Sequence, residues 1–88
     1  MDLWQACSQG DVAAARLLLD KGAAVNRANE YGKTPLYIAC EKGHVDAARL
    51  LLDNGAEVDR DTYGRTPLSI AKRKGHSAVV ALLEEHRK

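Results

Sequence analysis

The most regular feature of the sequence is a pattern of hydrophobic and polar positions that returns about every 33 residues. Residues 15–23, which read ARLLLDKGA, return as ARLLLDNGA at residues 48–56. Residues 31–36, which read YGKTPL, return as YGRTPL at residues 63–68. Periods of roughly 20 to 50 residues are typical of proteins built from stacked structural repeats. The pattern therefore predicts three related units in a chain of 88 residues.

Within the middle unit, the polar and apolar positions predict two short helices. Thr34 suits a helix N-cap, Pro35 suits the first helical position, and Gly43 suits a left-handed residue at the C-terminal end. After His44, apolar residues recur at three- and four-residue spacing, which predicts one face of a second helix that ends at Gly55. Helices of about eight to ten residues are marginal alone in water. Each unit is therefore expected to depend on neighbours stacked against it.

Aligned positions in the three units indicate where the stack ends. A side chain that faces the previous unit is exposed only in the first, and one that faces the next unit only in the last. Four aligned sets turn polar at one end in this way: Gln5, Ile38 and Ile70; Cys7, Cys40 and Lys72; Leu19, Leu52 and Glu84; Val12, Val45 and Ser77. We therefore expect a complete chain without buried-type residues on its end faces. Its expected parts are an N-terminal capping unit at residues 1–25, a full unit at 26–58 and a C-terminal capping unit at 59–88.

These motifs resemble the ankyrin repeat family. The matching residues are Thr34, Pro35 and Leu36, then Gly43 and His44, then Gly55 and Ala56, in a pattern with 33-residue spacing. The resemblance covers the whole chain and implies an all-α ankyrin solenoid of stacked helix-turn-helix units with short hairpin-like turns. It also implies that His44 and His76 have a structural role in bonding loop backbone.

The sequence departs from the family pattern in two ways. The histidine that the family usually places after Thr-Pro-Leu is replaced by Tyr37 in the middle unit and by Ser69 in the last. The Thr-Pro pair is replaced by Met1 and Asp2 in the first unit. These changes put in doubt the hydrogen bonds that the family's histidine supplies, but they leave the predicted fold unchanged.

Charge and hydropathy argue against two classes of partner. The 13 basic and 12 acidic residues leave a net charge of +1, so no global field draws the chain to nucleic acid or to a membrane. No apolar run approaches the roughly 18 residues of a membrane span, and the N-terminus lacks a secretory signal. We therefore expect a cytoplasmic or nuclear protein, with no assignment if the chain is synthetic.

The residue types that carry chemistry have structural interpretations. Cys7 and Cys40 occupy equivalent positions in adjacent helices, expected about 8 to 10 Å apart, which exceeds the roughly 4.4 to 6.8 Å between the α-carbons of a disulfide. They are therefore expected to be free, buried thiols in a reducing compartment. The same spacing disfavours one metal between His44 and His76. No CxxC, HExxH or P-loop pattern occurs, so we expect no metal, cofactor or catalytic residue, and the chain is predicted not to be an enzyme.

The resemblance implies that a partner is held by the hairpin tips and the concave surface of the first helices. Tryptophan, tyrosine and arginine dominate interface energetics, which favours the aromatic positions on that surface. Trp4 either belongs to this surface or covers the exposed end of the first unit. The positions expected to contact a partner are Trp4, Glu30, Tyr31, Lys33, Tyr37, Glu41, Lys42, Thr62, Tyr63, Arg65, Arg73 and Lys74.

Two local features leave alternatives open. Residues 72–74 form the one basic run, which either meets an acidic partner or is a solvated surface that Glu84 and Glu85 offset. Asn26 precedes the first tip, where ankyrin proteins resemble substrates of asparaginyl hydroxylation, although Ala24 stands where an acidic residue would strengthen that hypothesis.

The sequence predicts a non-enzymatic module for protein–protein interaction, expected to be a monomer, whose protein partner it does not identify. The alternative is an engineered minimal ankyrin scaffold or stability model without a dedicated partner. The near-identical second helices and the caps around one full unit favour this alternative. The difference between Glu30 and Thr62 at the two tips favours a binder instead.

Overall fold

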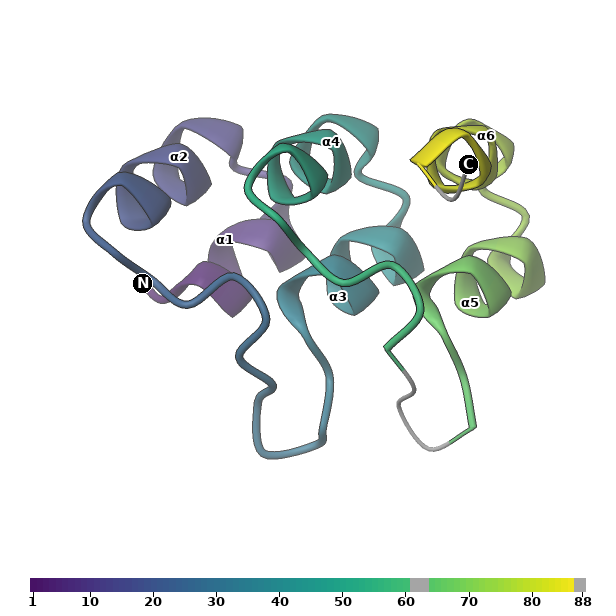
Figure 1. Ribbon diagram of the computed structural model, residues 1–88, viewed down its shortest axis with the longest axis horizontal. Helices are drawn as coiled ribbons and strands as arrows, with labels where there is room; N and C mark the ends of the chain where they lie inside the picture. The colour runs from purple at the N-terminus through teal and green to yellow at the C-terminus, as the bar shows by residue number, and fades with distance from the viewer. Residues whose placement is uncertain (61–63, 87–88) are drawn as a thin grey trace.

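The computed structural model describes residues 1–60 and 64–86, and over these residues its regular elements are six α-helices. The helices are α1 (Leu3–Gln9), α2 (Val12–Asp20), α3 (Pro35–Lys42), α4 (Val45–Asp53), α5 (Pro67–Lys74) and α6 (Ser77–His86). They form three antiparallel pairs, which we call the first, middle and last unit (Figure 1). The predicted all-α stack of helix-turn-helix units is confirmed.

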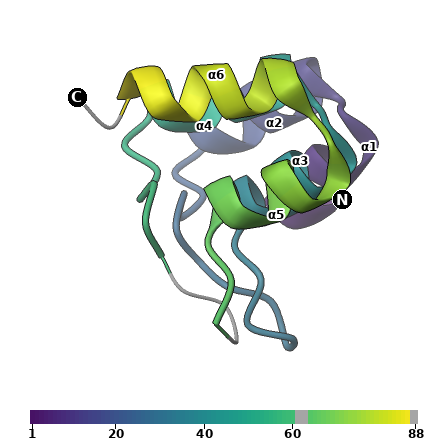
Figure 2. The ribbon, with the colours of Figure 1, turned by 90° about the vertical axis from the view of Figure 1, so that its right-hand side faces the viewer.

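The helices lie in two rows. The inner row contains α1, α3 and α5, and the outer row contains α2, α4 and α6, with neighbours in contact along each row (Figure 1). The first connecting loop, and the described parts of the second, extend beyond the inner row on the side away from the outer helices (Figure 2). The tip of the first loop and the inner helices therefore lie on one side of the molecule.

The helix boundaries follow from local capping. The backbone N–H of Tyr37 donates to Thr34 Oγ1 over 3.1 Å, so α3 begins where the Thr-Pro pair predicts. In the first unit Met1 aligns with Thr34 and cannot cap. Instead Asp2 accepts the Gln5 N–H over 2.8 Å, and the Gln5 side chain accepts the Asp2 N–H over 3.2 Å. Because the cap has moved by one residue, α1 begins one position later than α3.

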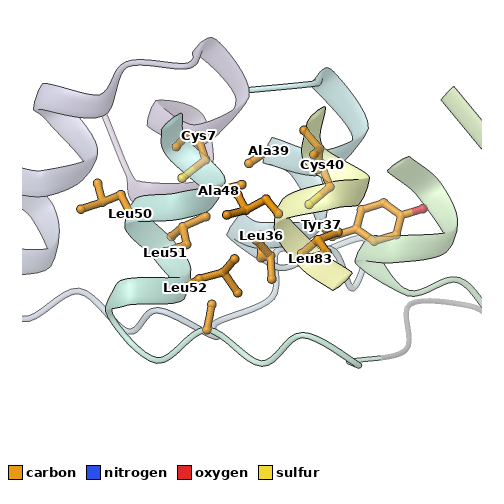
Figure 3. Close-up of a cluster of buried hydrophobic side chains, with 14 of the residues drawn as sticks. Cys7, Leu36, Tyr37, Ala39, Cys40, Ala48, Leu50, Leu51, Leu52 and Leu83 are labelled. Carbon is orange, nitrogen blue, oxygen red and sulfur yellow. The ribbon is translucent and has the colours of Figure 1, made fainter. Parts of the chain in front are cut away.

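The core is continuous through the three units. It consists of small and branched aliphatic side chains from both rows of helices, and Figure 3 shows part of it around Leu51 and Ala48 of α4. Leu51, Ala48 and Cys40 are fully buried. No single pair of helices could bury this set, so the hydrophobic contribution to stability depends on contacts between units.

A histidine joins each unit to the one before it. Nε2 of His44 lies 3.1 Å from the Ser8 carbonyl oxygen, and Nε2 of His76 lies 3.1 Å from the Glu41 carbonyl oxygen. The last carbonyls of a helix have no partner within that helix, so each histidine satisfies one in the preceding inner helix. The predicted structural role of these histidines is confirmed, but the acceptors are helix-end carbonyls rather than loop groups.

Glycine is required under each histidine ring. A β-carbon on Gly10 would lie 2.7 Å from His44 Nδ1, and one on Gly43 would lie 2.7 Å from His76 Nδ1. Both glycines also have positive φ angles, of 70° and 78°, which favour glycine at a helix end. The adjacent Gly43 and His44 therefore contact different units: Gly43 meets His76 of the last unit, and His44 meets Gly10 of the first.

The exposed ends of the stack differ from the expectation at one position. Leu17 is 55% exposed, whereas the aligned Leu50 and Leu82 are 8% and 6% exposed. The expectation that no buried-type side chain lies on an end face is wrong at Leu17, because α2 is the first outer helix of the described stack and α4 packs only on its other side. At the other end, Lys72 and Glu84 are exposed, as the aligned sets predict.

Candidate functional site

The first loop ends in a tip at residues 29–33, which is closed by the side chain of Asn29. Asn29 Oδ1 accepts the backbone N–H groups of Tyr31 and Lys33, each over 2.9 Å. The Asn29 N–H also donates to the Lys33 carbonyl over 2.9 Å, and the Gly32 N–H donates back to the Asn29 carbonyl over 3.0 Å. This closed turn displays Tyr31, whose side chain is 60% exposed.

The first loop is also fastened to the loop that follows it. Asn26 Oδ1 accepts the Glu57 N–H over 2.8 Å, and the Asn26 carbonyl accepts Nη1 of Arg60 over 2.9 Å. These bonds fix the base of the first tip relative to the next unit. The hydroxylation of Asn26 stays a prediction.

A hollow of about 600 Å³ lies between the first loop and the first turn of α1. We call it the tip hollow, and its lining includes Trp4, Arg27, Asn29, Glu30 and Pro35. Trp4 is partly buried, and its Nε1 has no hydrogen-bond partner among the described residues. Arg27 and Glu30 are exposed, so the hollow combines an aromatic wall with charges of both signs.

Arg27 is a residue that the sequence prediction missed. It aligns with Arg60, which binds the Asn26 carbonyl in the preceding loop. The described residues include no loop before the one that carries Arg27, so Arg27 has no equivalent acceptor among them and lines the tip hollow instead. The alignment of Arg27 with Arg60 could have indicated this difference, because only Arg60 has an earlier loop of the described stack beside it.

The prediction that Tyr37 is displayed on the concave surface is corrected. Tyr37 is 2% exposed and points from α3 toward α5, which packs against α3 (Figure 3). The aligned Ser69 is exposed because α5 is the last inner helix in the part of the chain that the structure describes. Trp4 and Tyr37 therefore do not form an exposed aromatic pair, since the middle tyrosine is covered by the last unit.

Lys33 and Glu41 contact each other above Tyr37. Lys33 Nζ lies 3.4 Å from Glu41 Oε1 and 5.7 Å from the centre of the Tyr37 ring. Both charged side chains are partly buried, while the neighbouring Lys42 is exposed. The structure thus brings three predicted contact residues together, with the ion pair as their accessible part.

The last unit presents mainly basic residues. Arg65, Arg73 and Lys74 are exposed, while Thr62, Tyr63, Arg87 and Lys88 lie outside the described residues. Lys72, Arg73 and Lys74 occupy the last turn of α5, where positive charge is favourable to the helix dipole. The basic run therefore has a role in helix stability whether or not it meets an acidic partner.

The two cysteine thiols lie in the core rather than on this surface. Cys7 and Cys40 are free and buried, as predicted, and burial raises the pKa of each thiol to about 12. Both remain protonated at neutral pH and are poor nucleophiles. Residues 1–60 and 64–86 contain no cluster of three or more histidine, cysteine, aspartate or glutamate side chains that could hold a metal ion. In the same part of the chain, no helix has the length and apolar character needed to cross a membrane.

Comparison with known proteins points to one family. A family model described as "Ankyrin repeats (3 copies)" matches residues 3–88. The crystal structure of the human ASB11 ankyrin repeat domain matches with a TM-score of 0.92 and 38% sequence identity. The match covers 98% of this chain but 39% of that one, so the chain spans about two fifths of its length. A search of curated proteins found no match.

Proposed function

The chain belongs to the ankyrin repeat family, whose members generally mediate protein–protein interaction, and from this premise we propose that it is a non-enzymatic module that binds a protein partner. The proposed contact surface is the side formed by the first tip, the tip hollow and the inner helices. Residues 1–25, 26–58 and 59–88 act in this proposal as an N-terminal cap, a full repeat and a C-terminal cap. The free, buried cysteines support an intracellular, reducing location.

The tip hollow is the observation that carries the proposal. It has a volume of about 600 Å³, and Trp4 provides an apolar contact within it for a partner's side chain. Tyr31 on the adjacent tip is a large aromatic side chain held in water, a residue type that is enriched where interfaces form. The hollow and the tyrosine together make a contact that a protein segment can cover.

The predicted contact residues have different roles in this proposal. Tyr37 supports the surface from below, and the ion pair of Lys33 and Glu41 forms part of it. Thr62 and Tyr63 remain predictions for the second tip. The exposed residues proposed to contact a partner directly are Glu30, Tyr31, Lys42, Arg65, Arg73 and Lys74, with the partly buried Trp4.

The proposal is tested by comparing the proteins captured by three forms of the chain. The first form is the wild type, and the second carries Tyr31→Ala with Arg27→Ala, both at exposed positions beside the tip hollow. The third is a control that carries Arg16→Ala with Arg49→Ala, exposed on the outer helices. Each form is attached to a resin, and quantitative mass spectrometry identifies the proteins that it retains. We expect some proteins to be retained by the wild type and by the control but not by the variant with Tyr31→Ala and Arg27→Ala. Identical sets captured by all three forms would count against the tip hollow as the binding site.

One observation favours the alternative of an engineered scaffold without a dedicated partner. Helices α2 and α4 have the same sequence except at Ala13 and Asp46, which is closer identity than the rest of the two units shows. The same capture experiment separates the two functions. A wild-type chain that retains nothing above the level of bare resin would favour the scaffold.

A further inference from the structure

The first unit exposes a side chain that is shaped to pack against a preceding helix pair. Leu50 points from α4 toward α2, and the two helices are in contact (Figure 3). Leu82 holds the same place in α6, which contacts α4. Leu17 is the aligned residue of α2 and is largely exposed. One end of the stack therefore displays an apolar side chain whose counterparts are buried in both later units.

The last unit has a matching hollow at the opposite end. This end hollow has a volume of about 310 Å³ and is lined by Lys72, Gly75, Ser77, Val80, Ala81 and Glu84. The aligned residues of the middle unit include Cys40, Ala48 and Leu52, all of which are buried. They are buried because α5 and α6 stack against that side of α3 and α4 (Figure 1). The end hollow is therefore the surface on which a further helix pair would stack.

Gly75 marks the part of the end hollow that no described side chain occupies. At Gly10 and Gly43, the space next to the α-carbon is occupied by the ring of a histidine from the following unit. At Gly75, which has the same backbone conformation, a β-carbon would meet nothing within 4 Å. The end hollow thus contains an open position for the side chain that begins the second helix of another unit.

The chain itself carries a complementary residue at that position. Asp11 aligns with His44 and His76, is exposed, and caps α2 by accepting the Ala14 N–H over 3.0 Å. If a second copy stacks on the last unit as the units stack on one another within the chain, its Asp11 would take the place of His44 and His76. Asp11 would then lie over Gly75, beside Lys72. Lys72 aligns with the fully buried Cys7 and Cys40, and a lysine covered at such a position needs carboxylate partners, which Asp11 of the second copy and Glu84 of the same hollow can supply. Leu17 of the same copy would lie toward Val80 and Ala81.

We propose that two copies of the chain associate head to tail, with the first unit of one stacked on the end hollow of the other. The two surfaces are different, so the contact is heterologous and can continue from copy to copy. This association uses Asp11, Leu17 and the end hollow, none of which lines the tip hollow, so it can be tested separately from the proposed partner-binding function. A contact with one leucine and one ion pair at its centre is weak, so its population grows with protein concentration.

The proposal is tested by cross-linking variants that each carry one added cysteine and are prepared separately. One preparation carries Leu17→Cys, and the other carries Ala81→Cys in the end hollow. The matched control is Ala78→Cys, another exposed alanine of α6 that does not line the end hollow. After equimolar mixing under mild oxidation, Leu17→Cys should form a disulfide with Ala81→Cys several-fold faster than with Ala78→Cys. The native thiols do not compete because both are buried.

Two results would overturn the head-to-tail contact. One is an equal rate of cross-linking with Ala81→Cys and with Ala78→Cys, and the other is preferential formation of Leu17→Cys homodimers. Sedimentation equilibrium provides an independent measurement without new thiols. The average mass of the wild type should rise with concentration into the millimolar range, while that of Leu17→Glu should stay monomeric with unchanged helix content. A wild type that remains monomeric at millimolar concentration would also overturn the proposal.

Discussion

At the scale of single residues, the contact between a histidine and a glycine determines how two units meet. His44 reaches back to the Ser8 carbonyl and covers Gly10, and His76 repeats both contacts one unit later. The hydrogen bond satisfies a carbonyl that α1 or α3 leaves without a partner at its C-terminal end. The contact between two units, which we call a joint, therefore depends on the Nε2 atom of a histidine and on the absence of a β-carbon at the glycine beneath its ring.

Removing the donor should destabilise the fold measurably. His44→Ala leaves the Ser8 carbonyl without its partner at a partly buried joint, so we expect the free energy of unfolding to fall by about 1 to 3 kcal/mol. Urea denaturation followed by circular dichroism measures this change. Arg49→Ala, at an exposed position of α4, is the control and should change stability little. Equal midpoints for the two variants would contradict the role of the histidine.

At the scale of helices, the capping residues decide where each inner helix begins. Thr34 and Thr66 cap α3 and α5 from the position before proline, whereas Asp2 caps α1 from the position that aligns with proline. The starts of α3 and α5 could be predicted because threonine followed by proline is a strong helix-start signal. The shifted start of α1 was not predicted, since no Thr-Pro pair occurs in the first unit.

The cap of α1 can be tested by two substitutions at one position. Asp2→Ala removes the acceptor of the Gln5 N–H, and we expect it to lower the free energy of unfolding by about 0.5 to 2 kcal/mol. Asp2→Asn keeps an acceptor oxygen and should retain most of the stability. Thermal denaturation of both variants beside the wild type measures the difference. Equal melting temperatures for the alanine and asparagine variants would show that the cap does not act through its oxygen.

The candidate site was less predictable than the helices. The aligned set of Trp4, Tyr37 and Ser69 turns polar only in the last unit. A position that faces the next unit is exposed only in the last unit, so this pattern predicts that Tyr37 faces the last unit and is covered by it. The family resemblance instead placed Tyr37 on the concave surface, which is why its burial was missed. The tip hollow depends on how the first loop folds over α1, and hydrophobic periodicity carries no information about that loop.

At the scale of the whole molecule, stability is shared between neighbouring units. The middle unit is covered on both sides, by α1 and α2 on one and by α5 and α6 on the other (Figure 1). The first and last units are each covered on one side. Local opening should therefore begin at the ends, because fewer apolar contacts are lost when a terminal unit separates.

Hydrogen exchange should reveal this order. Backbone amides of α3 and α4 are expected to exchange most slowly, and those of α1 and α6 should exchange faster under native conditions. Exchange followed by mass spectrometry of peptic fragments resolves the individual helices. Amides of α6 that exchange as slowly as those of α4 would show that the stack opens as a single unit instead.

The back-reaching histidine has a consequence for altering the length of the molecule. Every joint uses a carbonyl and a glycine from one unit and a histidine from the next, so the middle unit carries both halves of the joint. A second copy of residues 26–58 placed after Val58 would meet a compatible surface before it and another after it. Each such insertion would add one more loop tip to the inner side. The number of displayed loop tips can therefore be changed without redesigning either end of the chain.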